Sequence, residues 1–524
     1  MLTHVNTTEL AVFLFFFFTV TAIGFIASRW RSSSSHSVED WGLGGRQFGT
    51  LVTWFLVGGD FYTAYTMIAV PGLIYGVGAM GFFALPYTII VYPFVFIAMP
   101  RLWSVCERHG LITPADFVLF RYGSQGLASA IAITGMLALM PYIALQLVGM
   151  EVVLTQMGFT GSTPFLRNLP ITVAFAFLAA YTYSAGLRAP ALIAFVKDAM
   201  IYIVVIAAVL FIPPHFGGYQ HIFATAATRY SAQHPPASLI LRPGGYSAYA
   251  TLALGSALAA FMYPHTITSI LASANGRVIR RNAVLLPAYT LLLGLIAILG
   301  IVAVAVGVHV TETKQAVPAL LALSFPHWFV GFCFSAIAIA ALVPAAIMSI
   351  AAANLFTRNL YLPYLSQGAT HSQQAQVAKL ASLLTKFGAL VFVLFFPTQY
   401  AVNLQLLGGI WILQTFPSIA LGLWSRWFHH RALLIGWAAG MALGTWLTYL
   451  QHLQSSVWRI GTTAHNANVY IGVLALALNL TLTAVLTILF DRTGIARHAD
   501  RTSPDDYLRL DKQSPREAAL GSPA

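Results

Sequence analysis

Charged residues are scarce in this chain. They make up 8% of its 524 residues, whereas hydrophobic residues make up 58%. Ordinary soluble proteins carry about 25% charged and about 45–50% apolar residues, so this composition excludes a typical soluble domain. Cysteine is nearly absent, and because Cys106 and Cys333 lie far apart, the sequence predicts neither a disulfide framework nor a cysteine metal cluster.

Catalytic motifs are lacking as well. No HExxH, GxSxG or paired-histidine metal motif occurs, and the few ionisable residues within apolar runs are not spaced as a triad. We therefore expect no enzyme and no organic cofactor. The formal net charge is +12, but the basic residues lie singly at the ends of apolar runs rather than in a stripe, which argues against a nucleic-acid partner.

Long apolar runs are what the chain has in abundance. Runs of about 18–25 residues recur along almost its whole length, and each is long enough to cross a bilayer as a helix. The sequence thus predicts an all-α polytopic membrane protein with about thirteen transmembrane helices. They are expected near Leu10–Ala27, Thr50–Tyr75, Phe82–Trp103, Gly126–Met157, Pro170–Tyr183, Pro190–Ile212, Tyr246–Ala274, Ala283–Val308, His327–Phe356, Lys379–Phe396, Val402–Trp424, Ala432–Leu450 and Val469–Phe490.

The arginines at the ends of these runs predict an orientation. If the N-terminus lies outside and the C-terminus inside, most of them fall on the cytoplasmic side, as the positive-inside rule requires. Residues 1–491 then form one transmembrane domain, followed by a polar cytoplasmic tail, 492–524, whose composition predicts disorder. The connection 213–245 contains two PP pairs and an RPGG sequence, which predict a loop with short helices.

Two apolar runs are interrupted at corresponding places. One contains Gly58-Gly59-Asp60 and the other contains Gly255 and Pro264-His265. Paired interruptions of this kind indicate inverted repeats around a central binding site. We expect one repeat over about 50–212 and the other over about 246–425, with peripheral helices at 10–27, 432–450 and 469–490.

Several segments carry a family resemblance. They are WGLGGR at 41–46, LITPADFVLFRY at 111–122, GLRA at 186–189 followed by Lys197-Asp198, PHTI at 264–267 and FTRNLY at 356–361. In order and spacing they resemble the sodium:solute symporter family. The runs WFLVGGDFYTAYT, MPYIALQLVGMEVV and LVPAAIMSIAAANLFTRN resemble its bacterial monocarboxylate permease branch. The resemblance implies a leucine-transporter-type 5+5 inverted-repeat core that takes up lactate, pyruvate or a similar acid.

The chain departs from that family at its ion site. Val343 and Pro344 stand where the family usually carries two hydroxyl residues that bind sodium, and Lys197 stands where a small hydroxyl residue is common. Asp198 matches the family aspartate that supports the sodium site. Hard cations prefer oxygen ligands, and a buried ammonium supplies a positive charge of its own, so proton coupling, or none, ranks above sodium coupling. A snorkelling Lys197 beside Asp198 is the alternative.

Asp60 is the other candidate for ion coupling. An acid within a span is costly and indicates a functional site, although a helix cap formed by Asp60 is an alternative interpretation. For a carboxylate substrate, no mid-span arginine is available, so we expect half-helix N–H groups at Gly58, Gly59 and near Gly255–Ala259 to bind it. The candidate substrate-binding residues are Gly58, Gly59, Tyr62, Thr63, Tyr65, Thr66, Tyr142, Gln146 and His265. Packing is the alternative role for the aromatics, and bonding to a neighbouring carbonyl is the alternative for His265.

These observations favour a secondary transporter that imports short monocarboxylates across the bacterial cytoplasmic (inner) membrane by alternating access. The expected partners are a small carboxylate, the lipid bilayer, and sodium or a proton as coupling ion. Another small solute, such as an amino acid or a vitamin acid, is the alternative within transport. A membrane sensor is the alternative from another class, but we expect the polar tail to be too short for a kinase domain.

Overall fold

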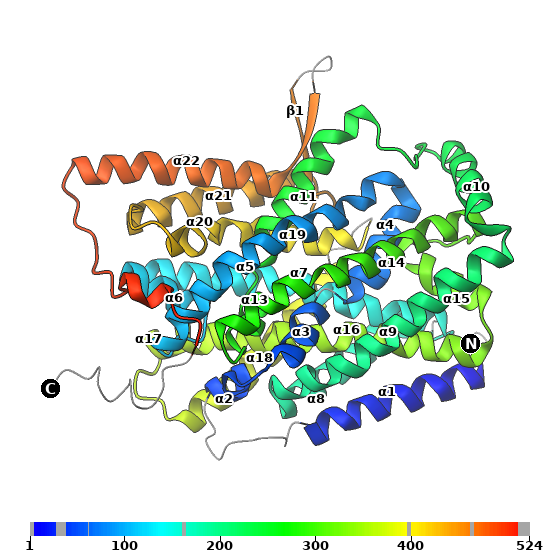
Figure 1. The fold of residues 1–524 in the computed structure, drawn as a ribbon, viewed down its shortest axis with the longest axis horizontal. Helices are drawn as coiled ribbons and strands as arrows, with labels where there is room; N and C mark the ends of the chain where they lie inside the picture. The colour runs from blue at the N-terminus through cyan, green and yellow to red at the C-terminus, as the bar shows by residue number, and fades with distance from the viewer. Residues whose placement is uncertain are drawn as a thin grey trace.

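A computed structural model describes residues 5–27, 38–60, 62–159, 164–395, 400–461 and 466–511. Most of this part of the chain is helical, and the long helices run side by side along one direction (Figure 1). Ten of the described helical stretches are long and apolar enough to cross a membrane. The fold class predicted from the apolar runs is thereby confirmed, while the count of about thirteen spans stays a prediction.

The helices follow the predicted spans closely. Those of the first half are α1 (Thr7–Ala27), α2 (Val38–Leu43), α3 (Thr50–Gly59), α4 (Val70–Val77), α5 (Ala84–Arg108), α6 (Pro114–Tyr122), α7 (Gln125–Gln156), α8 (Pro164–Ala185), α9 (Arg188–His215) and α10 (Gly218–Ala232). Those of the second half are α11 (Tyr246–Ala260), α12 (Pro264–Leu271), α13 (Gly276–Leu285), α14 (Pro287–Val306), α15 (Ala316–Ser324), α16 (His327–Phe356), α17 (Leu362–Tyr364), α18 (His371–Phe395), α19 (Val402–Ile412), α20 (Phe416–Ile419), α21 (His430–Leu450) and α22 (Ile471–Arg492).

The central helices form two sets of contacts. In the first helix group, α3, α5, α12, α13 and α14 contact one another in a chain of packed pairs. In the second helix group, α7, α8, α16 and α18 do the same. The apolar 18-residue stretch of the span His327–Tyr364, which contains α16, is fully buried inside the protein, whereas that of α1 is only 22% buried. The core therefore centres on α16, and α1 lies at the periphery, where lipid can cover it.

Two spans are broken near their middle, as the sequence predicted. The first consists of α3, a five-residue π-helical turn, Tyr65–Ala69, and α4, with residues 60–64 between α3 and the turn. The second consists of α11 and α12, with Phe261–Tyr263 between them. The break expected near Gly255–Ala259 was therefore placed too early. Gly255 lies inside continuous α11, where it allows Tyr470 to pack closely, and Pro264 starts the new helix because it has no N–H to offer the preceding turn.

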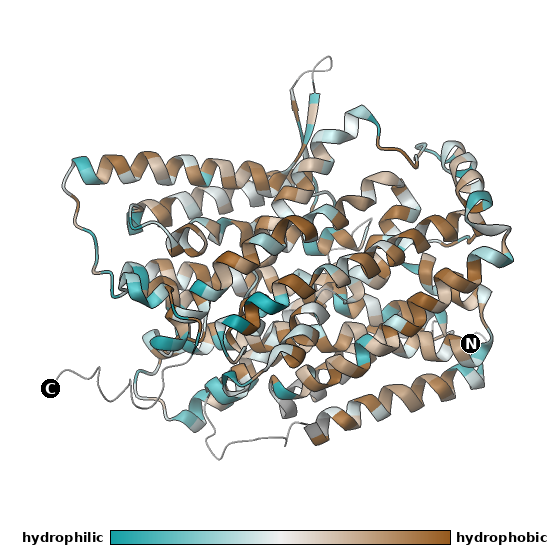
Figure 2. Ribbon diagram, in the orientation of Figure 1, coloured by the Kyte–Doolittle hydropathy of each residue, from teal (hydrophilic) through white to brown (hydrophobic). Residues whose placement is uncertain are grey.

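Hydrophilic residues gather at the two ends of the helix array (Figure 2). One end carries α2, α6, α13 and the chain's last described residues, and we call it the basic face because it holds Arg46, Arg101, Arg108, Arg121, Arg188, Arg277, Arg358 and Arg426. At the opposite end lies α10, so the connection predicted as a loop with short helices contains a 15-residue helix. The prediction of a helix within this connection is therefore confirmed, although this helix is longer than a short one.

Two further elements differ from the prediction. A hairpin of β1 (Val457–Gly461) and β2 (Asn466–Tyr470) connects α21 to α22, with Val457 opposite Tyr470. The segment after α22 was expected to be disordered, but residues 493–511 lie along the basic face and include a short 3-10 helix, Pro504–Tyr507. Its carboxylates pair with arginines of distant helices, which composition cannot reveal. The rest of the tail, 512–524, lies outside the described residues.

Candidate functional site

The first broken span supplies the centre of the site. Gly58 and Gly59 form the last turn of α3, so they present carbonyl oxygens rather than free N–H groups toward the break, which corrects that part of the prediction. Tyr62 N donates to the carbonyl of Gly59 at 3.2 Å. On the far side of the break the Thr63 hydroxyl accepts from Tyr65 N at 2.9 Å. Thr63, rather than the predicted alternative Asp60, therefore caps the start of the π-helical turn.

Lys197 of α9 fills the carbonyl end of this break. Its Nζ donates to the carbonyl of Gly59 at 2.7 Å and to the carbonyl of Tyr62 at 2.9 Å. It also lies 3.0 Å from Oδ1 of Asp198, and both side chains are 0% exposed. The alternative of a lysine that snorkels to water is therefore wrong. The ammonium thus donates two hydrogen bonds to backbone carbonyls and forms an ion pair with Asp198.

Asp198 is held from its other side by Tyr289 of α14. The Tyr289 hydroxyl donates to Oδ2 of Asp198 at 2.7 Å, and the Tyr289 ring lies 4.5 Å from the ring of Tyr62. The Tyr62 hydroxyl donates to the Tyr289 carbonyl at 3.2 Å, so it is already engaged within the protein. Gly58 has no side chain because the Tyr289 ring occupies the space a Cβ would need. The result is a buried ion pair braced by two tyrosines.

Asp60 connects the two broken spans. Its Oδ2 accepts from the Ser269 hydroxyl of α12 at 2.9 Å, whereas Oδ1 has no hydrogen-bond partner among the described residues. Asp60 is 4% exposed and lies close enough to Lys197 and Asp198 to interact with both electrostatically. The backbone also joins the spans, because Phe48 N donates to the carbonyl of Ala272 at 3.2 Å. A buried acid with one free oxygen is poised to accept a proton or a donor group.

Aromatic side chains lie near Asp60, and Tyr142 is close enough to interact with it electrostatically. The His265 ring lies 5.5 Å from the ring of Tyr142 and 5.4 Å from that of Tyr263, and the rings of Tyr65 and Tyr87 are 6.4 Å apart. In the described part of the chain, neither Nδ1 of His265 nor the hydroxyl of Tyr65 has a hydrogen-bond partner. Buried polar atoms are normally bonded, so these unpaired atoms are available to a polar ligand.

Three residues that were predicted to bind substrate form hydrogen bonds with backbone groups of the break. Gln146 of α7 accepts from Ala64 N at 3.0 Å and donates to the carbonyl of Tyr142 at 3.3 Å. The Thr66 hydroxyl donates to the carbonyl of Thr63 and accepts from Thr63 N. Gln146, Thr63 and Thr66 thus satisfy N–H and carbonyl groups that the broken helix leaves unbonded.

Val343 and Pro344 lie buried in the interior of α16. The helix continues through Pro344, which has no N–H and so leaves the carbonyl of Ala340 without its usual helical donor. The hydroxyls that α16 does carry, at Ser335 and Ser349, donate to carbonyls of the preceding helical turn. Val343 and Pro344 therefore offer no side-chain oxygen to a cation, and the carbonyls of Gly59 and Tyr62 accept hydrogen bonds from the Lys197 ammonium.

Sequence reasoning missed four residues of the site: Tyr87, Tyr263, Ser269 and Tyr289. Tyrosines in apolar runs look like packing residues, and no signal marked Tyr87 or Tyr289. Ser269 had one, because four of the six residues that follow Pro264 are polar in a span that is otherwise apolar.

Two facing broken helices around a buried polar centre define a membrane transporter rather than an enzyme. Residues 41–444 match the sodium:solute symporter family. A monocarboxylate transport permease protein of Rhizobium johnstonii is 55% identical over 494 residues, which are 93% of this chain and 98% of that protein. An uncharacterized symporter of Bacillus subtilis, YodF, is 34% identical over 490 residues, 93% of this chain and 94% of its own.

The chain belongs to the sodium:solute symporter family. A solved structure of a Na⁺-coupled sialic acid symporter in a substrate-bound outward-open state has a TM-score of 0.71 at 15% identity, over 93% of this chain and 99% of that chain. That likeness shows the fold alone, which is the leucine-transporter type with a 5+5 core. The predicted resemblance and fold class are both confirmed.

Proposed function

We propose that this transporter imports short monocarboxylates, such as lactate or pyruvate, across the bacterial cytoplasmic membrane by alternating access. The name of the Rhizobium relative supports a monocarboxylate as substrate, because the two chains are alike over nearly their whole lengths. The arginines of the basic face support a cytoplasmic location for that face and for the C-terminus, with the N-terminus outside.

The proposed substrate site lies where the two breaks meet. A carboxylate there would accept hydrogen bonds from the Tyr65 hydroxyl and from His265, and the N-terminal end of α12 adds its partial positive charge. Tyr142 and Tyr263 would enclose the short apolar part of the acid, since their rings flank His265. The absence of an arginine from this set fits a small acid held by neutral donors.

The coupling ion that we propose is the proton. One observation carries this proposal: Nζ of Lys197 is bonded to the Gly59 and Tyr62 carbonyls and to Asp198. Carbonyls at the end of an unwound half-helix are the groups that coordinate Na⁺ in broken-helix transporters. Here a fixed ammonium already provides that positive charge. Asp60, whose Oδ1 is unpaired and whose Oδ2 bonds Ser269, is then the group that takes up and releases the proton.

Sodium coupling is the competing candidate, favoured by the family and by the Na⁺-coupled structural relative. Uptake of labelled lactate and pyruvate into proteoliposomes separates the two. Accumulation driven by a pH gradient in sodium-free buffer, and lost in Asp60→Asn, supports the proposal. Accumulation that requires sodium refutes proton coupling. Failure of both acids to accumulate under either gradient refutes the substrate, and a competition series with amino acids and vitamin acids would then identify the class transported.

A further inference from the structure

The last described segment of the chain crosses the basic face from one side to the other. We call Arg497–Asp511 the C-terminal strap. It begins beside the connection between α20 and α21, where Arg497 donates to the carbonyls of Arg426 and Trp427 at 2.8 and 2.7 Å. It ends beside α13, where Gly276 N donates to the carbonyl of Leu510 at 2.7 Å. A segment this polar would not stay on the surface without specific partners.

Asp506 is the first of two anchors. Its carboxylate lies 2.6 Å from a guanidinium nitrogen of Arg108 and 2.9 Å from Nε2 of His109, both at the end of α5. The Asp506 side chain is only 2% exposed, and the Ser104 hydroxyl donates to the Asp506 carbonyl at 2.5 Å. Burial alone would raise the pKa of Asp506, but hydrogen bonds from Ser503 and His109 outweigh it and hold that pKa below its ordinary value.

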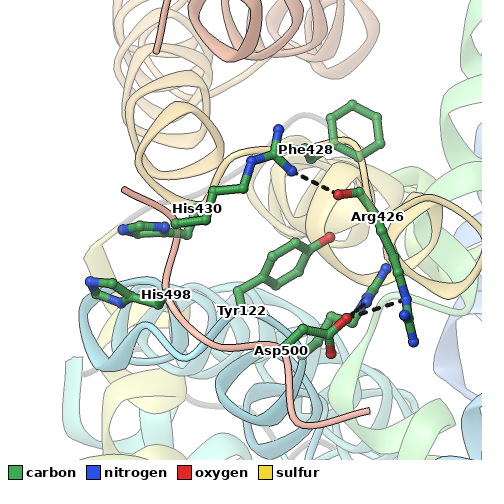
Figure 3. A pocket seen from close by; sticks show the side chains of 8 residues that line it. Tyr122, Arg426, Phe428, His430, His498 and Asp500 are labelled. Carbon is green, nitrogen blue, oxygen red and sulfur yellow. Dashed lines mark hydrogen bonds and ion pairs between the residues drawn. The ribbon is translucent and has the colours of Figure 1, made fainter. Parts of the chain in front are cut away.

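Asp500 is the second anchor. It forms ion pairs with the buried Arg121 of α6 and, at 3.3 Å, with Arg426. The strap backbone follows, because Arg501 N donates to the carbonyl of Phe120 at 3.1 Å. Figure 3 shows Asp500 and Arg426 at a pocket of about 330 Å³, part of it open to solvent. The pocket is lined by Arg121, Tyr122, Arg426, Phe428, His430, Arg497, His498 and Asp500. The rings of His430 and His498 stack there with centroids 3.9 Å apart.

The two anchors belong to different parts of the core. Arg108 and His109 end α5, and the strap also bonds α13, so this anchor holds the first helix group. Arg121 lies on α6, which packs on α7 of the second helix group. Transporters with inverted repeats open to alternate sides by rocking one such group against the other. A segment fastened to both groups at one face resists their separation at that face.

We propose that the C-terminal strap, docked on the basic face through the carboxylates of Asp500 and Asp506, holds the transporter closed at this face. Asp500 and Asp506 are the two recognition residues, and each fills a position between basic side chains. Opening toward this face then requires one anchor to dissociate. The strap thereby sets how often the central binding site opens toward the basic face. This holds for any substrate and any coupling ion.

Release of the strap can be measured by limited trypsin digestion of the detergent-solubilised protein at Arg501 and Arg509. Replacing both anchors, Asp500→Asn with Asp506→Asn, should raise the cleavage rate at least about tenfold, which corresponds to a loss of only about 1.4 kcal/mol of docking. Asp505→Asn is the matched control, because Asp505 lies next to Asp506 but is exposed. Cleavage of this control should stay at the parent rate.

Opening is measured separately with a reporter cysteine. Leu355→Cys, in a chain whose Cys106 and Cys333 are replaced by alanine, places a thiol on α16 at a position that is 0% exposed. Leu355 lies against Gly135 of α7, which Pro264 of α12 also contacts, so the thiol lies where the two helix groups meet. A membrane-impermeant maleimide should label it at least about threefold faster in the double anchor variant than in the Asp505→Asn control. Removal of residues 497–524 should have the same effect, which keeps the test valid if the double variant folds poorly.

Two results would overturn the proposal. If trypsin releases the strap faster but the maleimide rate stays at the control value, the strap is attached to the face without restraining it. If the double variant is cleaved no faster than the control, Asp500 and Asp506 are not the anchors. Neither readout uses substrate or an ion gradient. The proposal for the strap can therefore be refuted while the proposed transport function stands, and the proposed transport function can be refuted while the proposal for the strap stands.

Discussion

Replacing Lys197 by methionine should destabilise the protein by about 3–5 kcal/mol, because it breaks a fully buried ion pair by removing one partner. The change leaves Asp198 with a single remaining hydrogen bond, from Tyr289, in a place with no access to water. It also removes the donor from the carbonyls of Gly59 and Tyr62. Unfolding of the detergent-solubilised protein by SDS titration measures the loss.

The double variant Lys197→Met with Asp198→Asn supplies the internal control. It removes both charges at once, so it should recover at least about 1.5 kcal/mol of the stability lost in the single variant. If the single and double variants are equally stable, Lys197 and Asp198 are not coupled, and the reasoning about the ion site is wrong.

The variant Lys197→Ser tests with sodium whether the Lys197 ammonium occupies the place of a coupling ion. It removes the ammonium and restores the small hydroxyl residue that the family commonly carries at this position. Sodium should then stabilise the serine variant, by about 2.7 kcal/mol at a concentration a hundred times its dissociation constant, and should leave the parent unchanged. Thermal unfolding in sodium and in choline salts of equal ionic strength compares them. If sodium stabilises the parent protein as strongly as it stabilises the serine variant, the Lys197 ammonium does not take the place of a sodium ion.

Gly58→Ala should cost about 1–3 kcal/mol, since its Cβ would overlap the Tyr289 ring, whereas Gly49→Ala, which meets open space, should stay within about 0.5 kcal/mol of the parent in the same SDS titration. Equal stability of the two variants would contradict the close packing at Gly58. Gln146→Leu should cost about 1–3 kcal/mol and reduce the rate of substrate uptake, because it leaves Ala64 N unbonded in the break. A stable Gln146→Leu protein with parental uptake would show that the break does not depend on this hydrogen bond.

The long apolar helices were predictable because the thickness of a bilayer sets a minimum length for every helix that crosses it. The first break was predictable too, since Gly58-Gly59-Asp60 places two flexible residues and a charge within an apolar run. The second break was misplaced toward Gly255, because glycine in a membrane helix serves close packing as readily as it serves unwinding. Only the structure distinguishes the two roles, through the Tyr470 ring that lies against Gly255.

The long-range contacts were beyond prediction. The docking of Asp500 and Asp506 depends on arginines that lie hundreds of residues earlier, and nothing near either aspartate in sequence indicates a partner. The position of Lys197 shows the same limit. Its sequence context allows both a snorkelling and a buried side chain, and the choice follows from where α3 unwinds, which supplies carbonyls at the right distance.

A cation that is part of the polypeptide has an energetic consequence for the cell. The ammonium of Lys197 cannot leave with the substrate, so under the proposed coupling one proton and one carboxylate anion would cross together without net charge. The membrane voltage, worth about 2.3 kcal/mol per charge at 100 mV, would then contribute nothing to accumulation. Each pH unit across the membrane would contribute about 1.36 kcal/mol, a tenfold concentration ratio. The rate and extent of uptake would then rise with the external proton concentration and would not depend on the external sodium concentration.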